Sequence, residues 1–442
     1  MQTNKNPFNV RFNSITITKF NGSDKLDITP QVVEFTLYQS IFTPLLRADM
    51  VLSDFIGLMN NYPLSGEETV EVTIEQAGDP ASNAKRVFKT LNFVITAINQ
   101  ISFGDNARQM TYAIEMASEE AFVNAKTRVS HAYTSSIETM IQSLYKEYIN
   151  SKKNLKIFPT TSKSRKLVVP NLKPLDAINW LCKYAVATNS STYYTFAFYE
   201  TLQGFVFKSL QKPTYRDAEE NNALLNCTKE KYYYISNLEL LLNNKQAYDK
   251  FVQDGFNENR TINDLKINKR YTTLEKIIGG YYENEYVEVN MLQKDHLITK
   301  TAIQANKDPR SRSTSFTTLH REGMYNTPLY ISDIQNQYIQ DETSSRVRYA
   351  INNYDNLNQP SFRDKFGNSS RSFLAYAQVD ISVAVHANLE NRVGDLMYIQ
   401  LPEMHGFNLE NQPDKYLSGY FLTSEIKTVM RTGGYSQSYH RQ

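Results

Sequence analysis

The chain has 442 residues, a length that corresponds to about three domains, and 48 Lys and Arg against 46 Asp and Glu leave a formal net charge of +2. This balance gives no reason to expect a nucleic-acid or membrane partner that is selected by overall charge. The two cysteines, Cys182 and Cys227, lie far apart, which excludes a disulfide framework or a zinc ribbon as the organising feature.

The aromatic residues are mostly Tyr (30) and Phe (23), with one Trp. Tyr suits half-buried strand faces and subunit interfaces, although β propensity alone also explains the excess. No apolar stretch is long enough to span a bilayer, and Met1 to Ile15 shows no signal-peptide pattern. We therefore expect no membrane-spanning segment and a protein that folds in a reducing cytoplasm.

Residues 1–117 predict antiparallel β-structure, because apolar and polar residues alternate around positions 33–38, 70–75 and 110–116. Leu91 to Ile101 adds a strand, and Gly104–Asp105–Asn106 predicts a hairpin turn, so a small barrel or sandwich is expected. The side chains expected to be buried are Val33, Phe35, Val72, Ile74, Tyr112 and Ile114. The carboxylates expected on the opposite, water-facing sides of these strands are Glu34, Glu71, Glu75 and Glu115.

Residues 118–212 predict an α+β domain. Ser135 and Glu138 form a capping-box pattern ahead of an apolar helical stripe. A second helix is predicted to begin at Pro174 and to carry Cys182 on its buried face. Two aromatic strands follow, at 193–199 and 204–210.

The β pattern returns less regularly at 213–300, and residues 301–370 are a polar region interpreted as an insertion. Alternation resumes in residues 371–442, beginning at Val379 and continuing after the Gly394–Asp395 pair, which predicts a turn between short strands. This last segment has too few strands to close a barrel alone, so we expect it to complete a barrel begun by strands within 213–300. The overall class is α+β, mainly β.

No catalytic motif is visible. The six histidines are isolated from one another, and HExxH, GxSxG, P-loop and GxGxxG patterns are absent. Glu67–Glu68 and Glu119–Glu120 would supply carboxylates for a glycosidase, but both pairs also fit solvated turn or helix-start positions. The basic run from Lys152 to Lys166 fits a nucleic-acid patch or, with acidic residues on both sides, a solvated connecting segment. We expect no enzyme, no metal site and no cofactor.

Several segments resemble the central hub proteins of contractile-tail phage baseplates. They are Gln31 to Leu45 with its Ile41-Phe42-Thr43-Pro44, Ala48 to Asp54, Tyr62 to Val70, Tyr112 to Glu120, Val169 to Ile178, Phe198 to Leu210, Arg392 to Pro402, and Ser418 to Ser424. The similarity covers 31–212 well and 371–442 fairly, and it is poor between 213 and 370. These motifs mark strands and turns, and they identify a fold more than a site.

The resemblance implies two tube-like β-barrels per chain with an α+β domain between them, and a homotrimer that presents six similar barrels. Such a ring would connect a sixfold tail tube to a threefold spike. The implied partners are the central spike protein, the tail tube or tube-initiator protein, neighbouring baseplate proteins, and genomic DNA passing through the channel without specific binding. The implied location is the virion tail baseplate, assembled in the host cytoplasm.

Three alternatives remain at this stage: the hub of a related contractile injection or secretion machine, a carbohydrate-binding adhesin built from β domains, and a glycosidase. Within the hub interpretation, Glu71 and Glu75, with Glu34 and Glu115, are expected to line the DNA channel, where like charge would keep the phosphate backbone from binding. Alternatively, these side chains face the outer solvent or a neighbouring subunit.

Overall fold

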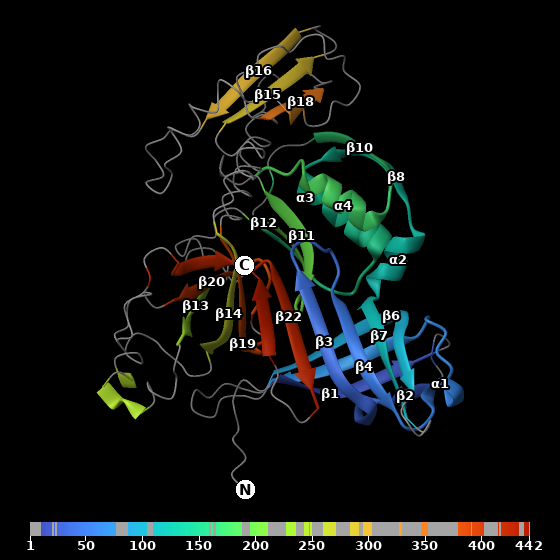
Figure 1. Cartoon of the computed structure of the whole chain (residues 1–442). Coiled ribbons are helices and arrows are strands. Elements are labelled where there is room, and N and C mark those ends of the chain that lie inside the picture. Colours follow the sequence, from blue (N-terminus) through green and yellow to red (C-terminus); the bar gives the residue numbers. More distant parts are fainter. Residues whose placement is uncertain are drawn as a thin grey trace.

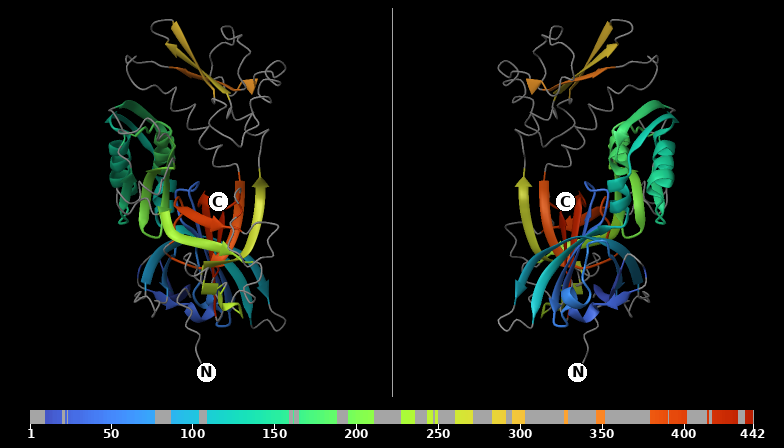
Figure 2. Two further views of the ribbon diagram at one scale, coloured as in Figure 1. Left: turned by 90° about the vertical axis from the view of Figure 1, so that its left-hand side faces the viewer. Right: turned by 90° about the vertical axis from the view of Figure 1, so that its right-hand side faces the viewer.

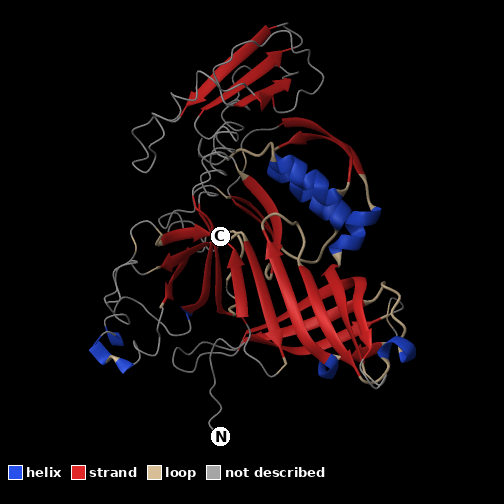
Figure 3. Cartoon of the chain, viewed as in Figure 1, coloured by secondary structure: helices blue, strands red, loops and turns tan. Residues whose placement is uncertain are grey.

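The computed structural model shows a mainly β protein with a few short helices (Figure 3). The residues that it describes are 10–19, 22, 24–76, 87–103, 109–158, 161, 165–187, 195–210, 227–235, 243–246, 248–249, 260–270, 283–290, 295–302, 327–328, 346–351, 379–389, 391–401, 414, 417–432 and 437–441. The α+β, mainly β class expected from the sequence is confirmed. The turn expected at Gly104–Asp105–Asn106 lies outside the described residues.

Fourteen of the described strands pair into one sheet (Figure 1). The strands of the amino-terminal half are β1 (Val10–Thr18), β2 (Lys25–Asp27), β3 (Val32–Ser40), β4 (Arg47–Asp54), β5 (Thr69–Gln76), β6 (Val87–Phe103) and β7 (Met110–Ser118). The strands of the carboxyl-terminal half are β13 (Cys227–Tyr234), β14 (Thr261–Arg270), β19 (Val379–His386), β20 (Leu396–Gln400), β21 (Gly419–Leu422), β22 (Glu425–Arg431) and β23 (Gln437–Arg441). The strand order is β2-β1-β5-β6-β7-β4-β3-β22-β23-β19-β14-β13-β20-β21.

Each half of the large sheet has its own apolar core. Buried side chains from β1 and from β3 to β7 meet in one cluster, so the first half curls around a common interior. Buried side chains from β13, β14, β19 and β20 form a second cluster. Pairing of β3 with β22, from Ser40 opposite Glu425 to Glu34 opposite Arg431, joins the two halves.

Two closed barrels are not confirmed. The last strand of the first half, β3, pairs with β22 of the other half, and no strand pairing among the described residues closes either half on itself. The strands at 227–270 and at 379–441 do pair in one sheet, as in β14 with β19. The domain boundaries expected from the sequence stay a prediction.

The expected buried set of the first half is correct except for Val33. Phe35, Val72, Ile74, Tyr112 and Ile114 are buried, whereas Val33 is 48% exposed. The pairing of β3 with β4 shifts register between Val32 and Glu34, so a bulge turns Val33 outward and leaves Val32 in the core.

Residues 119–210 form three layers that the sequence largely predicted. One layer is the pair β8 (Val129–Ser135) and β10 (Arg165–Leu172), and another is the sheet of β9 (Leu155–Phe158), β11 (Phe196–Thr201) and β12 (Gly204–Ser209). Between them lie α3 (Ile137–Leu144), which continues as a π-helical turn (Tyr145–Ile149), and α4 (Pro174–Cys182). Pro174 begins α4 and Cys182 is buried, as expected.

The remaining helices are short, and α3 begins one residue later than the sequence predicted. The structure also contains α1 (Leu58–Asn61), α2 (Glu120–Lys126) and a 3-10 turn (Thr29–Gln31). The N-cap of α3 is Ser136, whose Oγ accepts a hydrogen bond from the Thr139 backbone N–H. The expected capping box is therefore wrong by one residue, because Ser135 ends β8 and the Glu138 carboxylate instead accepts a hydrogen bond from the Thr161 N–H.

A separate four-stranded sheet stands away from the large one. Its strands are β15 (Glu283–Asn290), β16 (Asp295–Ala302), β17 (Thr327–Pro328) and β18 (Arg346–Ile351), in the order β16-β15-β18-β17. Figures 1 and 2 show it at the end of the molecule opposite the end that carries α1 and β2. Strands from 283–302 thus pair with strands from the region interpreted as an insertion.

Candidate functional site: two buried charge clusters

The three-stranded sheet of β9, β11 and β12 carries a buried charge on each of two neighbouring strands, β11 and β12. Glu200 lies on β11, and its carboxylate accepts hydrogen bonds from Leu46 N–H (3.0 Å), Ser118 Oγ (2.6 Å) and Lys153 Nζ (2.7 Å). Lys153 also donates to Glu120 at 2.7 Å. Since Leu46 directly precedes β4 and Ser118 is the last residue of β7, this first cluster attaches the α+β domain to the first half of the large sheet.

Electrostatics keeps Lys153 charged. Burial alone would lower the pKa of Lys153, but Glu200 and Glu120 outweigh this effect and raise it. Burial raises the pKa of Glu200, with Lys153 and Ser118 acting against the shift. The Lys153 ammonium thus pairs with the carboxylates of both Glu120 and Glu200, and both oxygens of Glu200 accept hydrogen bonds.

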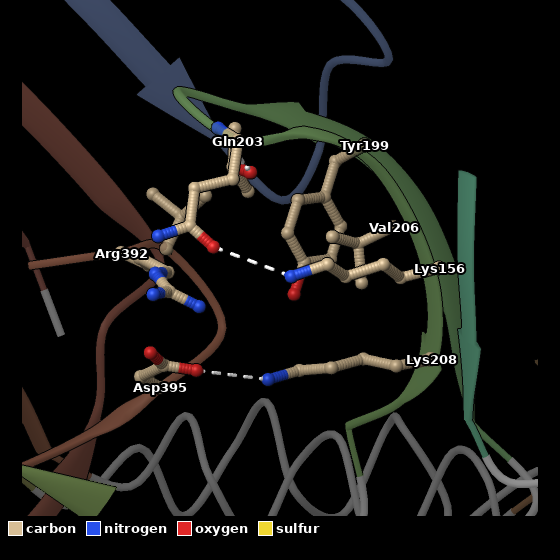
Figure 4. Close-up of a pocket in the computed structure, with 9 residues that line it drawn as sticks. Lys156, Tyr199, Gln203, Val206, Lys208, Arg392 and Asp395 are labelled. Atoms are coloured by element: carbon tan, nitrogen blue, oxygen red, sulfur yellow. Dashed lines mark hydrogen bonds and ion pairs between the residues drawn. The ribbon is translucent and has the colours of Figure 1, made fainter. Parts of the chain in front are cut away.

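The second cluster attaches the same sheet to the other half (Figure 4). Lys208 Nζ, on β12, lies 3.1 Å from Asp395 Oδ1, just ahead of β20, and the two side chains are 3% and 9% exposed. Burial alone would lower the pKa of Lys208, but Tyr199 and Asp395 outweigh it, so the pKa is raised. Burial raises the pKa of the Tyr199 hydroxyl to about 12.

Gly394 is required for this contact. Its φ of +79° lies in the left-handed region, which favours glycine. A Cβ at this position would collide with the Tyr199 hydroxyl and lie 2.9 Å from Cζ of its ring. The Gly394–Asp395 pair that the sequence marked as a turn therefore also lets a buried tyrosine pack against the backbone.

One carboxylate of each pair considered for a glycosidase has a structural partner. Glu68 is 2% exposed and accepts hydrogen bonds from the Ser65 and Gly66 backbone N–H groups in its own turn. Glu120 is 5% exposed and bound to Lys153. The expectation that these two side chains, and Lys153 in the basic run, are solvated is therefore wrong, whereas Glu67 and Glu119 are exposed.

The four carboxylates expected to face water differ in their surroundings. Glu71 and Glu115 are exposed, and Glu115 accepts a hydrogen bond from Asn99. Glu34 is half-buried and pairs with Arg431 at 2.7 Å across the β3–β22 joint. Glu75 is 3% exposed and pairs with Arg11, so its expected exposure to water is wrong.

A groove of about 790 Å³ lies over the joint between the two halves. Its lining includes Arg47, Asp49 and Glu115 from the first half and Glu425, Lys427 and Tyr439 from the second. The lining carries charges of both signs together with apolar side chains such as Phe42 and Ile426. The groove is therefore mixed in character and nearly balanced in charge.

Metal sites and membrane helices are not found in the described part of the chain. No group of three or more His, Cys, Asp or Glu side chains there could hold a metal ion. Among the same residues, no helix is long and apolar enough to cross a membrane.

No family model matches the chain, and no curated protein matches it in sequence. Among solved structures it is similar to the tail protein from Neisseria meningitidis MC58, with a TM-score of 0.50 and 10% identity over 97% of this chain and 95% of that one. It is also similar to the 43 kDa tail protein of prophage MuSo2 from Shewanella oneidensis, with a TM-score of 0.50 and 8% identity over 97% of both chains. The chain thus has the fold of phage tail proteins. At the level of the fold, this confirms the resemblance to baseplate hub proteins seen in the sequence.

Proposed function

We propose that this chain is a structural subunit of a contractile-tail baseplate, the hub that joins the tail tube to the central spike. The observation that carries the proposal is the division of the large sheet into two halves of seven strands, each with its own core. Three chains would present six such halves, each half acting as one tube-like barrel. A ring of this kind would match a sixfold tube above and a threefold spike below.

The two charge clusters support a structural role in which the parts of the chain keep fixed positions. They hold the α+β domain against both halves through side chains that are distant in sequence, such as Glu200 with Ser118 and Lys208 with Asp395. Buried, paired charges fix geometry, since a shifted arrangement would leave a charge without its partner. A hub between tube and spike needs a fixed angle between its parts.

The partners in this proposal are two further copies of the chain, the central spike protein, the tube or its initiator, and neighbouring baseplate proteins. Genomic DNA would pass through the ring without specific binding. Catalysis is not part of the proposed role.

The bore would be lined by exposed carboxylates, and Glu71 and Glu115 are the two of the expected four that are available. The charge of Glu75 is buried with Arg11, and that of Glu34 is offset by Arg431. Phage carrying Glu71→Lys and Glu115→Lys should eject DNA more slowly, because lysines on the wall would bind phosphates. Glu67→Lys, on an exposed turn, is the matched control. A normal ejection rate in the double variant would show that Glu71 and Glu115 do not line the bore.

The oligomeric state tests the hub itself. Light scattering measures the mass of the purified chain alone and after mixing with the spike protein of the same tail. We expect three copies of this chain per assembly, either in both samples or in the mixture only. A stable complex of one chain with one spike polypeptide would contradict the proposal. A monomer that does not associate with the spike would contradict it as well.

A further inference from the structure

We propose that the pocket beside the Lys208–Asp395 pair is a binding site for a small inorganic anion of the size of chloride. The pocket lies between β9, β11 and β12 of the α+β domain and the segment 391–395 that leads into β20 (Figure 4). It therefore sits at the contact between the α+β domain and the second half of the large sheet. The side chains that line it and carry the argument are Lys156, Tyr199, Gln203, Lys208, Arg392 and Asp395.

The charges around this pocket do not balance. Three cations, Lys156, Lys208 and Arg392, line it together with one carboxylate, Asp395. Lys208 and Asp395 neutralise one another at 3.1 Å. Among the described residues, Lys156 donates only to the neutral amide oxygen of Gln203, at 3.3 Å. The positive charges of Lys156 and Arg392 thus remain without a counterion in the pocket. Uncompensated charge is unfavourable there because the pocket is partly enclosed.

Arg392 is the side chain that most clearly lacks a ligand. Its Nε is buried and has no hydrogen-bond partner among the described residues. No ion pair joins its guanidinium to a described carboxylate, although Asp395 and Arg392 line the same pocket. A buried N–H without an acceptor is rare in proteins and calls for a partner such as a water or an ion. In Figure 4 the guanidinium lies on the same side of the pocket as Asp395, facing Lys156 and Lys208.

The size of the pocket selects the ligand. Its volume is about 20 Å³, enough for one water-sized particle. A monatomic anion fits this space, whereas a phosphate, a sulfate or an organic carboxylate is larger. A halide would accept hydrogen bonds from the Arg392 guanidinium and from the Lys156 ammonium, and it would lower the net positive charge.

Chloride bound here would strengthen the contact between the α+β domain and the second half. The donors come from β9 (Lys156) and from the segment before β20 (Arg392), so an anion between them bridges the two parts. A ligand that binds only the folded state stabilises it by mass action. The stability of the folded chain should therefore depend on chloride in a saturable way.

The test compares thermal unfolding of the full chain in sodium chloride and in sodium gluconate at equal ionic strength. The wild type should unfold at a higher temperature in chloride, with saturation, and Lys156→Gln/Arg392→Gln should lose that difference. Lys166→Gln, an exposed lysine of the same basic run, should keep it. Equal transitions of the wild type in both salts would overturn the proposal, as would a difference that persists in the double variant.

A second measurement does not depend on the folding of the variants. Crystals of the wild type grown in sodium bromide should show an anomalous peak between Lys156 and Arg392. Crystals that diffract well but show bromide only elsewhere would overturn the site. A water molecule in the pocket in the presence of bromide would have the same consequence.

Discussion

Lys208 and Asp395 stand 187 residues apart in sequence, yet Nζ and Oδ1 lie 3.1 Å apart in a contact that excludes almost all solvent. One residue belongs to the α+β domain and the other to the second half of the large sheet. The pair thus reports directly on whether these two parts are packed together.

Asp395→Asn should destabilise the protein by about 3–5 kcal/mol, because it leaves the Lys208 charge buried and unpaired. The double variant Lys208→Met/Asp395→Leu should lose less, since it removes both charges. Urea unfolding measures both. Asp264→Asn, at an exposed position of β14, should change stability by no more than about 0.5 kcal/mol. A double variant as unstable as Asp395→Asn would show that packing, and not the unpaired charge, sets the loss.

Lys153→Met should cost a similar ~3–5 kcal/mol, because Glu120 and Glu200 lose their shared counterion inside the protein. The neighbouring Lys152 is exposed, and Lys152→Met is expected to be nearly neutral. Chemical unfolding of the two variants side by side gives the comparison. Equal stabilities would mean that Lys153 is no more than a surface lysine.

Gly394→Ala should be strongly destabilising, by roughly 2–4 kcal/mol, because it combines backbone strain with a collision against Tyr199. Tyr199→Phe removes the hydroxyl that the new methyl group would meet first. Adding it to Gly394→Ala should therefore recover part of the loss, and a double-mutant cycle measures the recovered part. Strictly additive effects would indicate that backbone strain alone accounts for the damage.

The sequence predicts the strands and helices well because their signals are local. Alternation at Phe35, Val72 and Ile114 is set by a periodicity of two, and Pro174 begins a helix by its own fixed φ. The bulge that exposes Val33 depends on how β3 pairs with β4, and the pattern of one strand does not contain that information.

The candidate site was largely missed for the same physical reason. Lys153 looks like one more charge in a basic run, and its partners Glu120 and Glu200 lie 33 and 47 residues away. The Gly394–Asp395 pair was recognised only as a turn. The sequence does contain one indication of the first cluster. Glu200 lies within the apolar strand β11, and an acidic residue in such a strand is unusual unless it is paired.

His440 provides a test at acidic pH. It lies on β23 between Ile426 of β22 and Val383 of β19, is 1% exposed, and neither ring nitrogen has a hydrogen-bond partner among the described residues. Burial lowers the pKa of His440 to about 3. The ordinary value in the unfolded chain is about 6.5, so below that pH the unfolded state binds a proton more readily than the folded state.

His440 therefore leaves stability intact above about pH 6.5 and reduces it progressively as the pH falls toward 3. At pH 5 the loss should be about 2 kcal/mol. His440→Leu should be neutral or slightly stabilising at pH 7, since the imidazole makes no hydrogen bond to any described residue. The substitution should reduce the loss between pH 7 and pH 5 by that amount. Urea unfolding at the two pH values measures the difference, with His131→Gln, at an exposed position of β8, as the control. The same acid loss in His440→Leu and in the wild type would show that other groups govern the response.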